Sequence, residues 1–392
     1  TDLQTAVETG RAAGERRIEW RALLALGRLW TVQDYGESRG YIDQALELAN
    51  RIGDPAVLAE SLNRLGNWHL NREDLPAAIA YHQQALAIVE QVGDQEQMAS
   101  TLDLLGLASL IRGDVAAGVG YYDRAISLFR ELEDHAALVT SLVARGVATS
   151  GANTQPAVLL PAGPIAAHND LAEALQLARE IGSPSAEAWA LCTQSIAYTG
   201  QGQFGRSLEA AHAALEIATA IGHREWMAGS QSAQGALYTD MLAPEEARPQ
   251  LEQALALAER LQSRHWIHHA TGSLSVACWL LDDLAQARAY LEAVLSPGTD
   301  MDSVHKRTCW ARRAELALLE GDPEIDVETV GSLLREVSRI YIDQDRKLVH
   351  KISRWDVIRK PDGSIRDRRP RNLPPPNVTD TPLRWSGIMI KK

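Results

Sequence analysis

Histidines are the residues whose types and spacing in this sequence come nearest to a chemical site. In "SRHWIHHATG", His265 and His269 stand four residues apart, so a helix would place both imidazoles on one face. His268 lies between them, and His305 follows 40 residues after His265. Two histidines at this spacing can hold zinc, but a zinc site needs a third convergent ligand, and the sequence offers none. We therefore expect no metal and interpret these histidines as helix-surface and interhelical residues, with zinc binding as the alternative.

Catalytic motifs are absent from the sequence. It contains no GxSxG, no HExxH and no glycine-rich phosphate loop. Cys192, Cys278 and Cys309 are widely spaced and form no CxxC set, which is typical of a reducing compartment. No apolar run approaches the roughly 18 residues that span a bilayer, and no signal peptide is visible. We therefore expect a cytoplasmic protein that is not an enzyme, needs no cofactor and contacts no membrane.

The composition favours helices and divides the chain electrostatically. Hydrophobic residues make up 45% of the 392 residues but aromatics only 5%, so the core must be built mainly from Ala and Leu. The formal net charge of -12 argues against general binding of nucleic acid or anionic membranes. Residues 345–392, however, carry 13 Lys and Arg against 5 Asp, a net charge of +8, and the rest of the chain carries -20. The C-terminal stretch therefore differs in kind from the body.

One sequence unit recurs along the chain at a nearly fixed period. Its first marker is a small residue, found at Gly27, Gly66, Gly106, Gly146, Ser195, Gly235, Ser275 and Ala314. These markers stand 39 or 40 residues apart, except for one spacing of 49 in the fourth unit. Two further series, the alanines that open "ALELA" and its relatives and the turns related to "IGDP", repeat with matching spacings. The agreement of three markers predicts a repeat architecture.

Each unit is predicted to be a helical hairpin. Apolar residues recur at intervals of three and four in two segments, which end at turns such as "NRED" and "IGDP". A glycine inside a helix costs up to about 1 kcal/mol, so its repeated use indicates a close contact with the second helix of the hairpin. The Gly-Asp pairs supply a helix end followed by a capping or turn residue.

The units resemble tetratricopeptide repeats in a long form of about 40 residues. The segment "LNRLGNWHLNREDLPAAIAYHQQALAI" carries the pattern through Leu62, Leu65 and Gly66 in the first helix and through Tyr81 and Ala85 in the second. The resemblance covers most of the chain and about eight units. The units are similar to the long repeats in the sensor arms of bacterial signal-transduction ATPases and transcriptional activators. The phosphate-binding motif GxxxxGK[ST] is not present in this sequence.

The resemblance implies an all-α fold. We expect a right-handed α-α superhelix of about eight helical hairpins in residues 1–330, followed by a terminal helix and a basic, proline-rich, non-repeat tail in residues 331–392. The first helices should line the inner wall of the superhelix, where members of the family bind peptides. Residues three before, one after and four after each marker should then face that groove.

The groove prediction names twelve residues: Asn63, Asn67, Leu70, Asp103, Leu107, Leu110, Val143, Val147, Ile196, Thr199, Thr239 and Trp279. They are mostly small and apolar, which suits an apolar helix or an extended segment. The asparagine amides could bind the backbone of an extended ligand, because an amide both donates and accepts; solvated groove asparagines are the alternative. The carboxylate clamp by which some family members bind chaperone tails needs groove lysines, and the chain has no lysine before Lys306.

Two other features accompany the repeats. The extra nine residues of the fourth unit fall in "SGANTQPAVLLPAGP", where Val158, Leu159 and Leu160 could form a lid over the groove or pack on their own repeat. Trp226 and Trp266 are 40 residues apart near the starts of first helices, and Trp189 lies close to the same register. This recurrence favours packing between repeats, with an aromatic recognition stripe as the alternative.

The segment "RWDVIRKPDGSIRDRRPRNLPPP" fits no part of the repeat. Its first half predicts two short strands around the turn at Pro361, and its second half predicts an extended polyproline segment. Its basic residues are Arg359, Lys360, Arg366, Arg368, Arg369 and Arg371. The tail could cap the last repeat or lie across the acidic body, contact a partner or nucleic acid, or be a disordered end.

Three hypotheses for function follow. The leading one is a protein-interaction scaffold that binds a peptide or protein segment in its concave groove, or self-associates through its ends. The second is a regulatory sensor arm of a larger ATPase or transcriptional regulator, in which ligand binding changes the superhelix. The third is contact with nucleic acid through the basic tail alone.

Overall fold

The computed structural model describes residues 2–30, 35–149, 165–295, 303–320, 355–359 and 365–370. Within them lie α1 (Asp2–Ala13), α2 (Arg16–Trp30), α3 (Tyr35–Ile52), α4 (Pro55–Asn71), α5 (Leu75–Val92), α6 (Gln95–Arg112), α7 (Val115–Glu131), α8 (His135–Thr149), α9 (Ile165–Glu180), α10 (Pro184–Gly200), α11 (Phe204–Ala220), α12 (Arg224–Asp240), α13 (Pro244–Leu261), α14 (Arg264–Leu280), α15 (Leu284–Val294) and α16 (Val304–Glu320). Two strands follow, β1 (Trp355–Arg359) and β2 (Ile365–Pro370).

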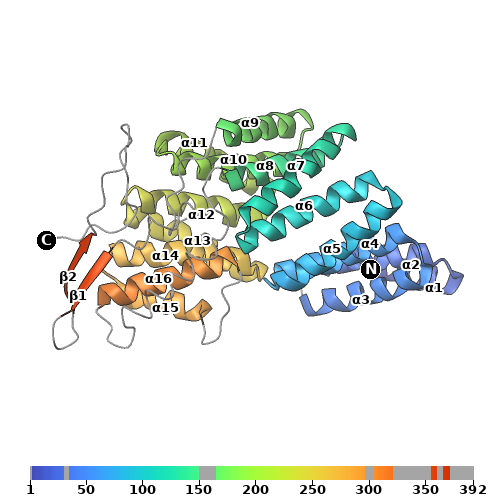
Figure 1. The fold of residues 1–392 in the computed structure, drawn as a ribbon, viewed down its shortest axis with the longest axis horizontal. Coiled ribbons are helices and arrows are strands. Elements are labelled where there is room, and N and C mark those ends of the chain that lie inside the picture. Colours follow the sequence, from blue (N-terminus) through green and yellow to red (C-terminus); the bar gives the residue numbers. More distant parts are fainter. Residues whose placement is uncertain are drawn as a thin grey trace.

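The helices form a stack of antiparallel hairpins, which confirms the predicted all-α superhelix (Figure 1). All eight marker residues fall in even-numbered helices, from α2 to α16, and each of α2 to α14 packs on the odd-numbered helix that follows it. Even-numbered helices of successive repeats also contact one another, so they form the inner layer. The second helix of the eighth unit and the predicted boundary near residue 330 lie outside the described residues.

The marker glycines lie where the two helices of a hairpin cross closely. A Cβ atom added to Gly66 would lie 2.5 Å from the ring of His82, and one added to Gly106 would lie 2.7 Å from the ring of Tyr122. The sequence prediction of close helix contacts is therefore confirmed at these positions. The second helix presents a ring to the space that the missing side chain leaves.

The turns between helices are fixed by local capping. Asp94 accepts a hydrogen bond from the Gln97 backbone N–H at 3.0 Å, and Asp134 accepts one from Ala137 at 3.0 Å. Gly93 and Gly113 end α5 and α6 in the left-handed conformation, at φ 72° and 93°. These contacts satisfy backbone groups that helix ends would otherwise leave unpaired, as the Gly-Asp pairs predicted.

The recurring tryptophans pack between repeats, as the sequence predicted. The rings of Trp189 and Trp226 stack with centroids 5.3 Å apart, and Trp226 Nε1 donates to Ser185 Oγ at 2.9 Å. The ring of Trp266 in turn lies against Gly229 of the preceding first helix. An aromatic ring therefore fills the space between neighbouring first helices in this half of the molecule.

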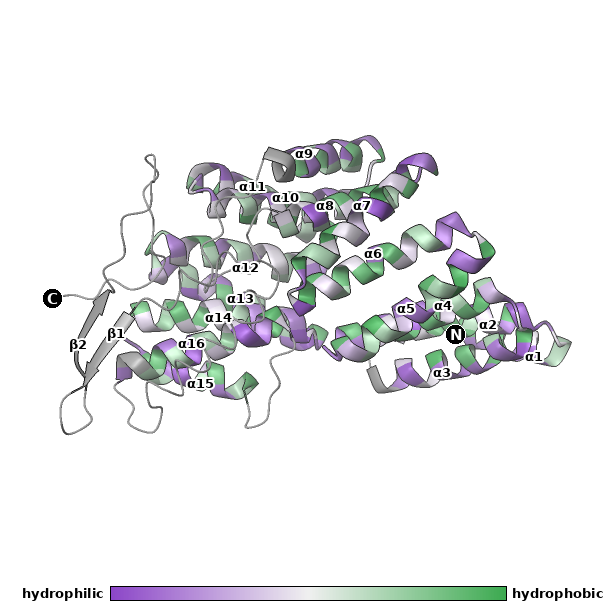
Figure 2. Ribbon diagram, viewed as in Figure 1, coloured by the Kyte–Doolittle hydropathy of each residue, from purple (hydrophilic) through white to green (hydrophobic). Residues whose placement is uncertain are grey.

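The core lies between the two helix layers and is built mainly from Ala and Leu, with Tyr122 and Phe129 among its largest buried side chains. Figure 2 shows hydrophobic and hydrophilic residues alternating around the helices. In the part of the chain that the structure describes, no helix is both long and apolar enough to cross a membrane. The three cysteines are buried and free.

The C-terminal segment contains the predicted hairpin. Strands β1 and β2 pair antiparallel, with Trp355 opposite Pro370 and Val357 opposite Arg368. The predicted lid residues Val158, Leu159 and Leu160 lie outside the described residues, as does the polyproline segment. Whether the tail caps the last repeat stays a prediction.

Candidate functional site

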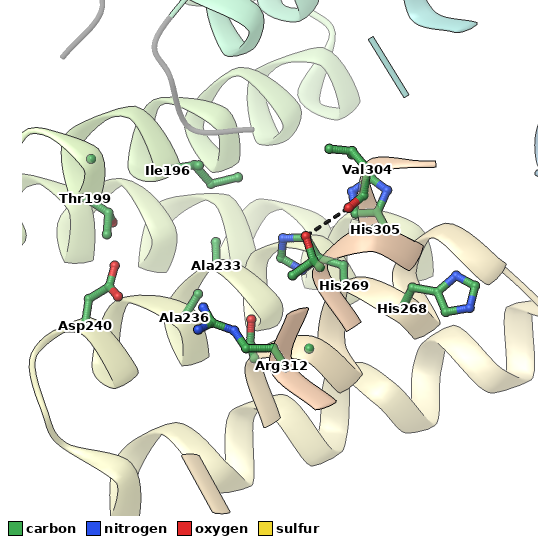
Figure 3. A pocket seen from close by; sticks show the side chains of 14 residues that line it. Ile196, Thr199, Ala233, Ala236, Asp240, His268, His269, Val304, His305 and Arg312 are labelled. Atoms are coloured by element: carbon green, nitrogen blue, oxygen red, sulfur yellow. Dashed lines mark hydrogen bonds between the residues drawn. The ribbon is translucent and has the colours of Figure 1, made fainter. Parts of the chain in front are cut away.

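A cavity of about 140 Å³ opens on the inner face between α10, α12, α14 and α16 (Figure 3). Its apolar lining comes from Ile196, Ala233, Ala236, Gly272 and Val304. These small and branched residues leave space that larger side chains on the same helices would fill. An engineered cavity of about 150 Å³ holds one benzene molecule, so this cavity has room for one side chain of a ligand.

Three residues that line this cavity carry polar atoms without partners. Nδ1 of His269, Nδ1 of His305 and Nε of Arg312 are buried, and none has a hydrogen-bond partner among the described residues. A buried polar atom without a partner costs about 1–3 kcal/mol, so native structures nearly always satisfy it with protein, water or a ligand. Three such atoms on lining residues leave unused hydrogen-bonding capacity in the wall of this cavity.

The cavity residues His269 and His305 are neutral at neutral pH. Burial, and to a smaller extent the nearby His265, lower the pKa of His269 to about 4. Burial and the neighbouring histidines also hold the pKa of His305 well below its ordinary value. A neutral imidazole carries one N–H donor and one acceptor nitrogen, so each ring can match either kind of ligand group through its choice of tautomer.

Arg312 and Asp240 bring a cation and an anion to the cavity wall. In Figure 3, His269 and His305 lie on one side, Thr199 and Asp240 on the other, and the guanidinium of Arg312 is directed into the space between them. Arg312 also donates to Glu315 at 2.8 Å, which fixes its side chain. The cation of Arg312 therefore lies between the two histidines and the anion of Asp240.

Four of the predicted groove residues lie at or near the cavity. Ile196 and Thr199 line it directly, and the hydroxyl of Thr199 is bound to Ser207 Oγ at 2.7 Å. Thr239 is buried and donates to the Gly235 carbonyl, and Trp279 lies under the guanidinium of Arg312 at 5.7 Å. Their contact with a ligand stays a prediction.

The groove residues three before a marker lie between repeats rather than on the surface. Asn63 donates to Thr101 at 2.7 Å and its carbonyl faces His82 at 3.0 Å, so its amide is already engaged. Asp103 accepts a hydrogen bond from Ser141, and the Val143 side chain is fully buried. The superhelix rotates this position toward the next first helix.

The remaining predicted groove residues divide by position. Leu70 and Leu110 are buried in the core, whereas Leu107 is 36% exposed. Asn67 and Val147 are half-buried, and the Asn67 carbonyl oxygen has no hydrogen-bond partner among the described residues. Positions directly after a marker are thus at least partly accessible, and ligand binding by Asn67 stays a prediction.

The histidine cluster holds no metal-binding geometry. Within the described residues, no group of three or more His, Cys, Asp and Glu side chains is arranged to bind a metal ion. The rings of His265 and His305 instead pack edge to face with centroids 4.3 Å apart. The expected interhelical position is confirmed for His265 and His305, and His268, His269 and His305 line the cavity.

Sequence reasoning missed Asp240, Arg312 and Val304 as residues of the cavity. They stand at offsets from the markers that differ from the three predicted ones. The sequence feature that could have revealed the cavity is the set of small residues Ala233, Ala236 and Gly272, which leave space between the inner helices.

The hairpins with an inner groove define a helical-repeat scaffold, and comparison with known proteins identifies the repeat. Residues 22–91 match the family model of the tetratricopeptide repeat. The described fold is that of a tetratricopeptide-repeat superhelix. No curated protein sequence matches the chain.

Solved structures share the fold at low sequence identity. NprR in complex with its cognate peptide NprX is 13% identical, with a TM-score of 0.55, over 85% of this chain and 94% of that one. A Rap protein complexed with competence and sporulation factor is 14% identical, with a TM-score of 0.54, over 89% and 96%. A STAND protein from Pyrococcus horikoshii with a tetratricopeptide-repeat sensor is 14% identical over 89% of this chain and half of that one, with a TM-score of 0.48. That last superposition is too loose to support an inference.

Proposed function

We propose that this protein is a non-enzymatic scaffold that binds a peptide or an extended protein segment on its inner face and anchors one ligand side chain in the cavity between α10, α12, α14 and α16. The observation that carries the proposal is an inner-face cavity, partly apolar in its lining, whose residues His269, His305 and Arg312 each carry a polar atom without a partner among the described residues. The fold is shared with an NprR structure in complex with its cognate peptide and with a Rap structure complexed with competence and sporulation factor.

The cavity favours an anchor that is partly apolar and partly polar. Ile196, Ala233 and Val304 offer apolar contact, while His269, His305 and Arg312 offer hydrogen bonds. Such a mixture is typical of small-ligand and side-chain pockets, in which a few polar groups set orientation. The remainder of the ligand would run along the inner layer past Leu107 and Asn67.

A display library of random peptides tests this proposal. The wild-type chain should enrich related sequences, and an Ala236→Trp variant, which fills the cavity, should bind a selected peptide at least about tenfold more weakly. Ala87→Trp on the exposed side of α5 is the matched control and should bind like the wild type. If no sequence family is enriched, or if both tryptophan variants bind equally well, the cavity is not the anchor.

The alternative of a regulatory arm uses the same groove. In a larger ATPase or transcriptional regulator, a ligand bound on the inner face would favour one arrangement of the superhelix over another. A nucleotide-binding domain encoded upstream in the same gene would support this alternative. The third hypothesis, nucleic-acid contact through the basic tail, would require salt-sensitive binding that is lost when the chain ends at residue 344.

A further inference from the structure

The second repeat meets the last described helices at Glu73. This residue follows α4 in the second repeat, yet its carboxylate lies against α14 and the start of α16, about 200 residues later in the chain. Oε1 and Oε2 lie 3.3 and 3.1 Å from Nδ1 of His268, and Lys306 Nζ lies 3.8 Å from Oε2. Ser303 Oγ, which also caps α16, lies 3.5 Å from Oε1. The contact closes helices α4 to α16 into a ring.

All the groups in this contact are buried. Glu73 is 3% exposed, Lys306 6% and His268 7%. Burial alone would raise the pKa of Glu73, but the hydrogen bond and charge of His268 and the charge of Lys306 outweigh it and hold the pKa below its ordinary value. Glu73 is therefore ionised at neutral pH. A buried carboxylate that loses its partners is strongly destabilised, so the cluster is stable only while the ring is closed.

A second contact seals the same junction. Arg307, only 2% exposed, donates through Nη2 to the carbonyl oxygen of Arg112 at 2.7 Å. That carbonyl ends α6, where a cation is favoured by the helix dipole. Gly113, at φ 93°, leaves room for the guanidinium, because a Cβ there would overlap Nη2. Two turns of the N-terminal half thus hold successive residues of α16.

The junction and the cavity share two helices. His268 contacts Glu73 while its neighbour His269 lines the cavity, and Lys306 contacts Glu73 while its neighbour His305 lines the cavity. We propose that Glu73 is a positioning residue for the ligand cavity: it holds α16 and α14 against the second repeat and so fixes the wall that carries His305 and Arg312. The part of this inference that concerns the ligand rests on the proposed function, whereas the ring closure stands by itself.

Because the Glu73 contact consists of buried charges, its main effect is to position α14 and α16 rather than to add stability. Replacing a buried ion pair by apolar residues of similar volume is often neutral or stabilising, so such pairs add little net stability by themselves. Their effect is to penalise every arrangement in which the partners are apart. The contacts of Glu73 are therefore lost together when the ring opens. Because coupling between two sites is reciprocal, a ligand that binds the cavity of the closed ring must also stabilise the closed ring.

The test is a charge swap in the full chain. Glu73→Lys, Lys306→Glu and the double variant are compared with the wild type by hydrogen exchange of the α16 amides, by the radius of gyration from solution scattering, and by affinity for a peptide selected on the wild type. Glu90→Lys breaks an exposed ion pair with Arg124 between neighbouring repeats and is the matched control.

Each single junction variant should speed exchange in α16 by about tenfold or more, expand the molecule and weaken peptide binding by about tenfold. The double variant should restore all three toward wild-type values, and Glu90→Lys should change none. Unaltered α16 exchange and dimensions in Glu73→Lys would overturn the proposal, and so would faster exchange throughout the chain that the double variant does not reverse. If no peptide is selected, the proposed function fails while exchange and scattering still decide the ring closure.

Discussion

At the residue scale, two kinds of contact recur in this chain. In one, a glycine packs against a large side chain of the neighbouring helix; in the other, polar side chains form hydrogen bonds between repeats. Gly106 lies under the ring of Tyr122, and Asp103 of the same helix lies between repeats with Ser141. Both follow from the requirement that first and second helices cross closely. Substitutions at Gly106 and Asp103 should therefore change the stability of the protein more than substitutions at exposed positions of the same helices or their neighbours.

Replacing Gly106 by Ala should destabilise the protein. The added methyl group would lie 2.7 Å from the Tyr122 ring, and overpacking of this kind costs about 1–3 kcal/mol. Gly120→Ala, on α7 with no atom within 4 Å of its Cβ position, should instead stabilise by about 0.5–1 kcal/mol. Urea unfolding of both variants measures the difference. Equal effects would contradict the close-crossing interpretation.

Asp103 should make the stability depend on pH. Burial raises the pKa of its carboxyl to about 6, although the Ser141 hydrogen bond lowers it. The folded state then holds this proton more tightly than the unfolded state, so the free energy of unfolding falls as the pH rises from about 4 to about 6. In the Asp103→Asn variant, the decrease in the free energy of unfolding between pH 4 and pH 7 should be smaller than in the wild type. Urea titrations at the two pH values check this, and an unchanged difference would refute it.

At the element scale, each hairpin is defined by its own caps and by the helix that follows. Asp residues start several helices and left-handed glycines end others, so most turns are fixed by residues within them. Two second helices, α11 and α13, begin without a side-chain cap. This contrast allows helix starts to be compared within one molecule.

Removing one cap and adding another should have opposite effects. Asp94→Ala removes the hydrogen bond to the Gln97 N–H and should cost about 1 kcal/mol. Ala243→Asp supplies a side-chain acceptor at the uncapped start of α13 and should stabilise by a comparable amount. Chemical denaturation of the two variants measures both changes. A destabilised Ala243→Asp would show that tertiary contacts, and not capping, hold that turn.

At the scale of the whole molecule, the repeats curve until the last described helix touches the turns after α4 and α6. The cavity that we propose to hold a ligand lies beside this junction. Helices α14 and α16 therefore take part both in the proposed ligand cavity and in the contact that closes the ring.

A peptide that binds the cavity should stabilise the whole chain. At a free concentration of 100 times its Kd, it should raise the free energy of unfolding by about 2.7 kcal/mol, because only the folded state binds it. Slower hydrogen exchange should concentrate in α14 and α16. Denaturation with and without peptide measures the effect, with Ala236→Trp as the variant that should lose it. Equal protection in α2 and α3 would place the site elsewhere.

The sequence by itself determined the repeat, the hairpins, their caps, the close glycine crossings and the tryptophan packing. Each of these depends on contacts within a repeat or between neighbours, and Gly66 and His82 or Trp189 and Trp226 are close enough along the chain for periodicity to reveal them. The tertiary structure alone decided that Asn63 and Asp103 face the next repeat, that Arg312 reaches the cavity, and that Glu73 meets Lys306. The physical reason is that curvature is the sum of small rotations between successive repeats, so contacts across the ring depend on all of them together and on no single unit.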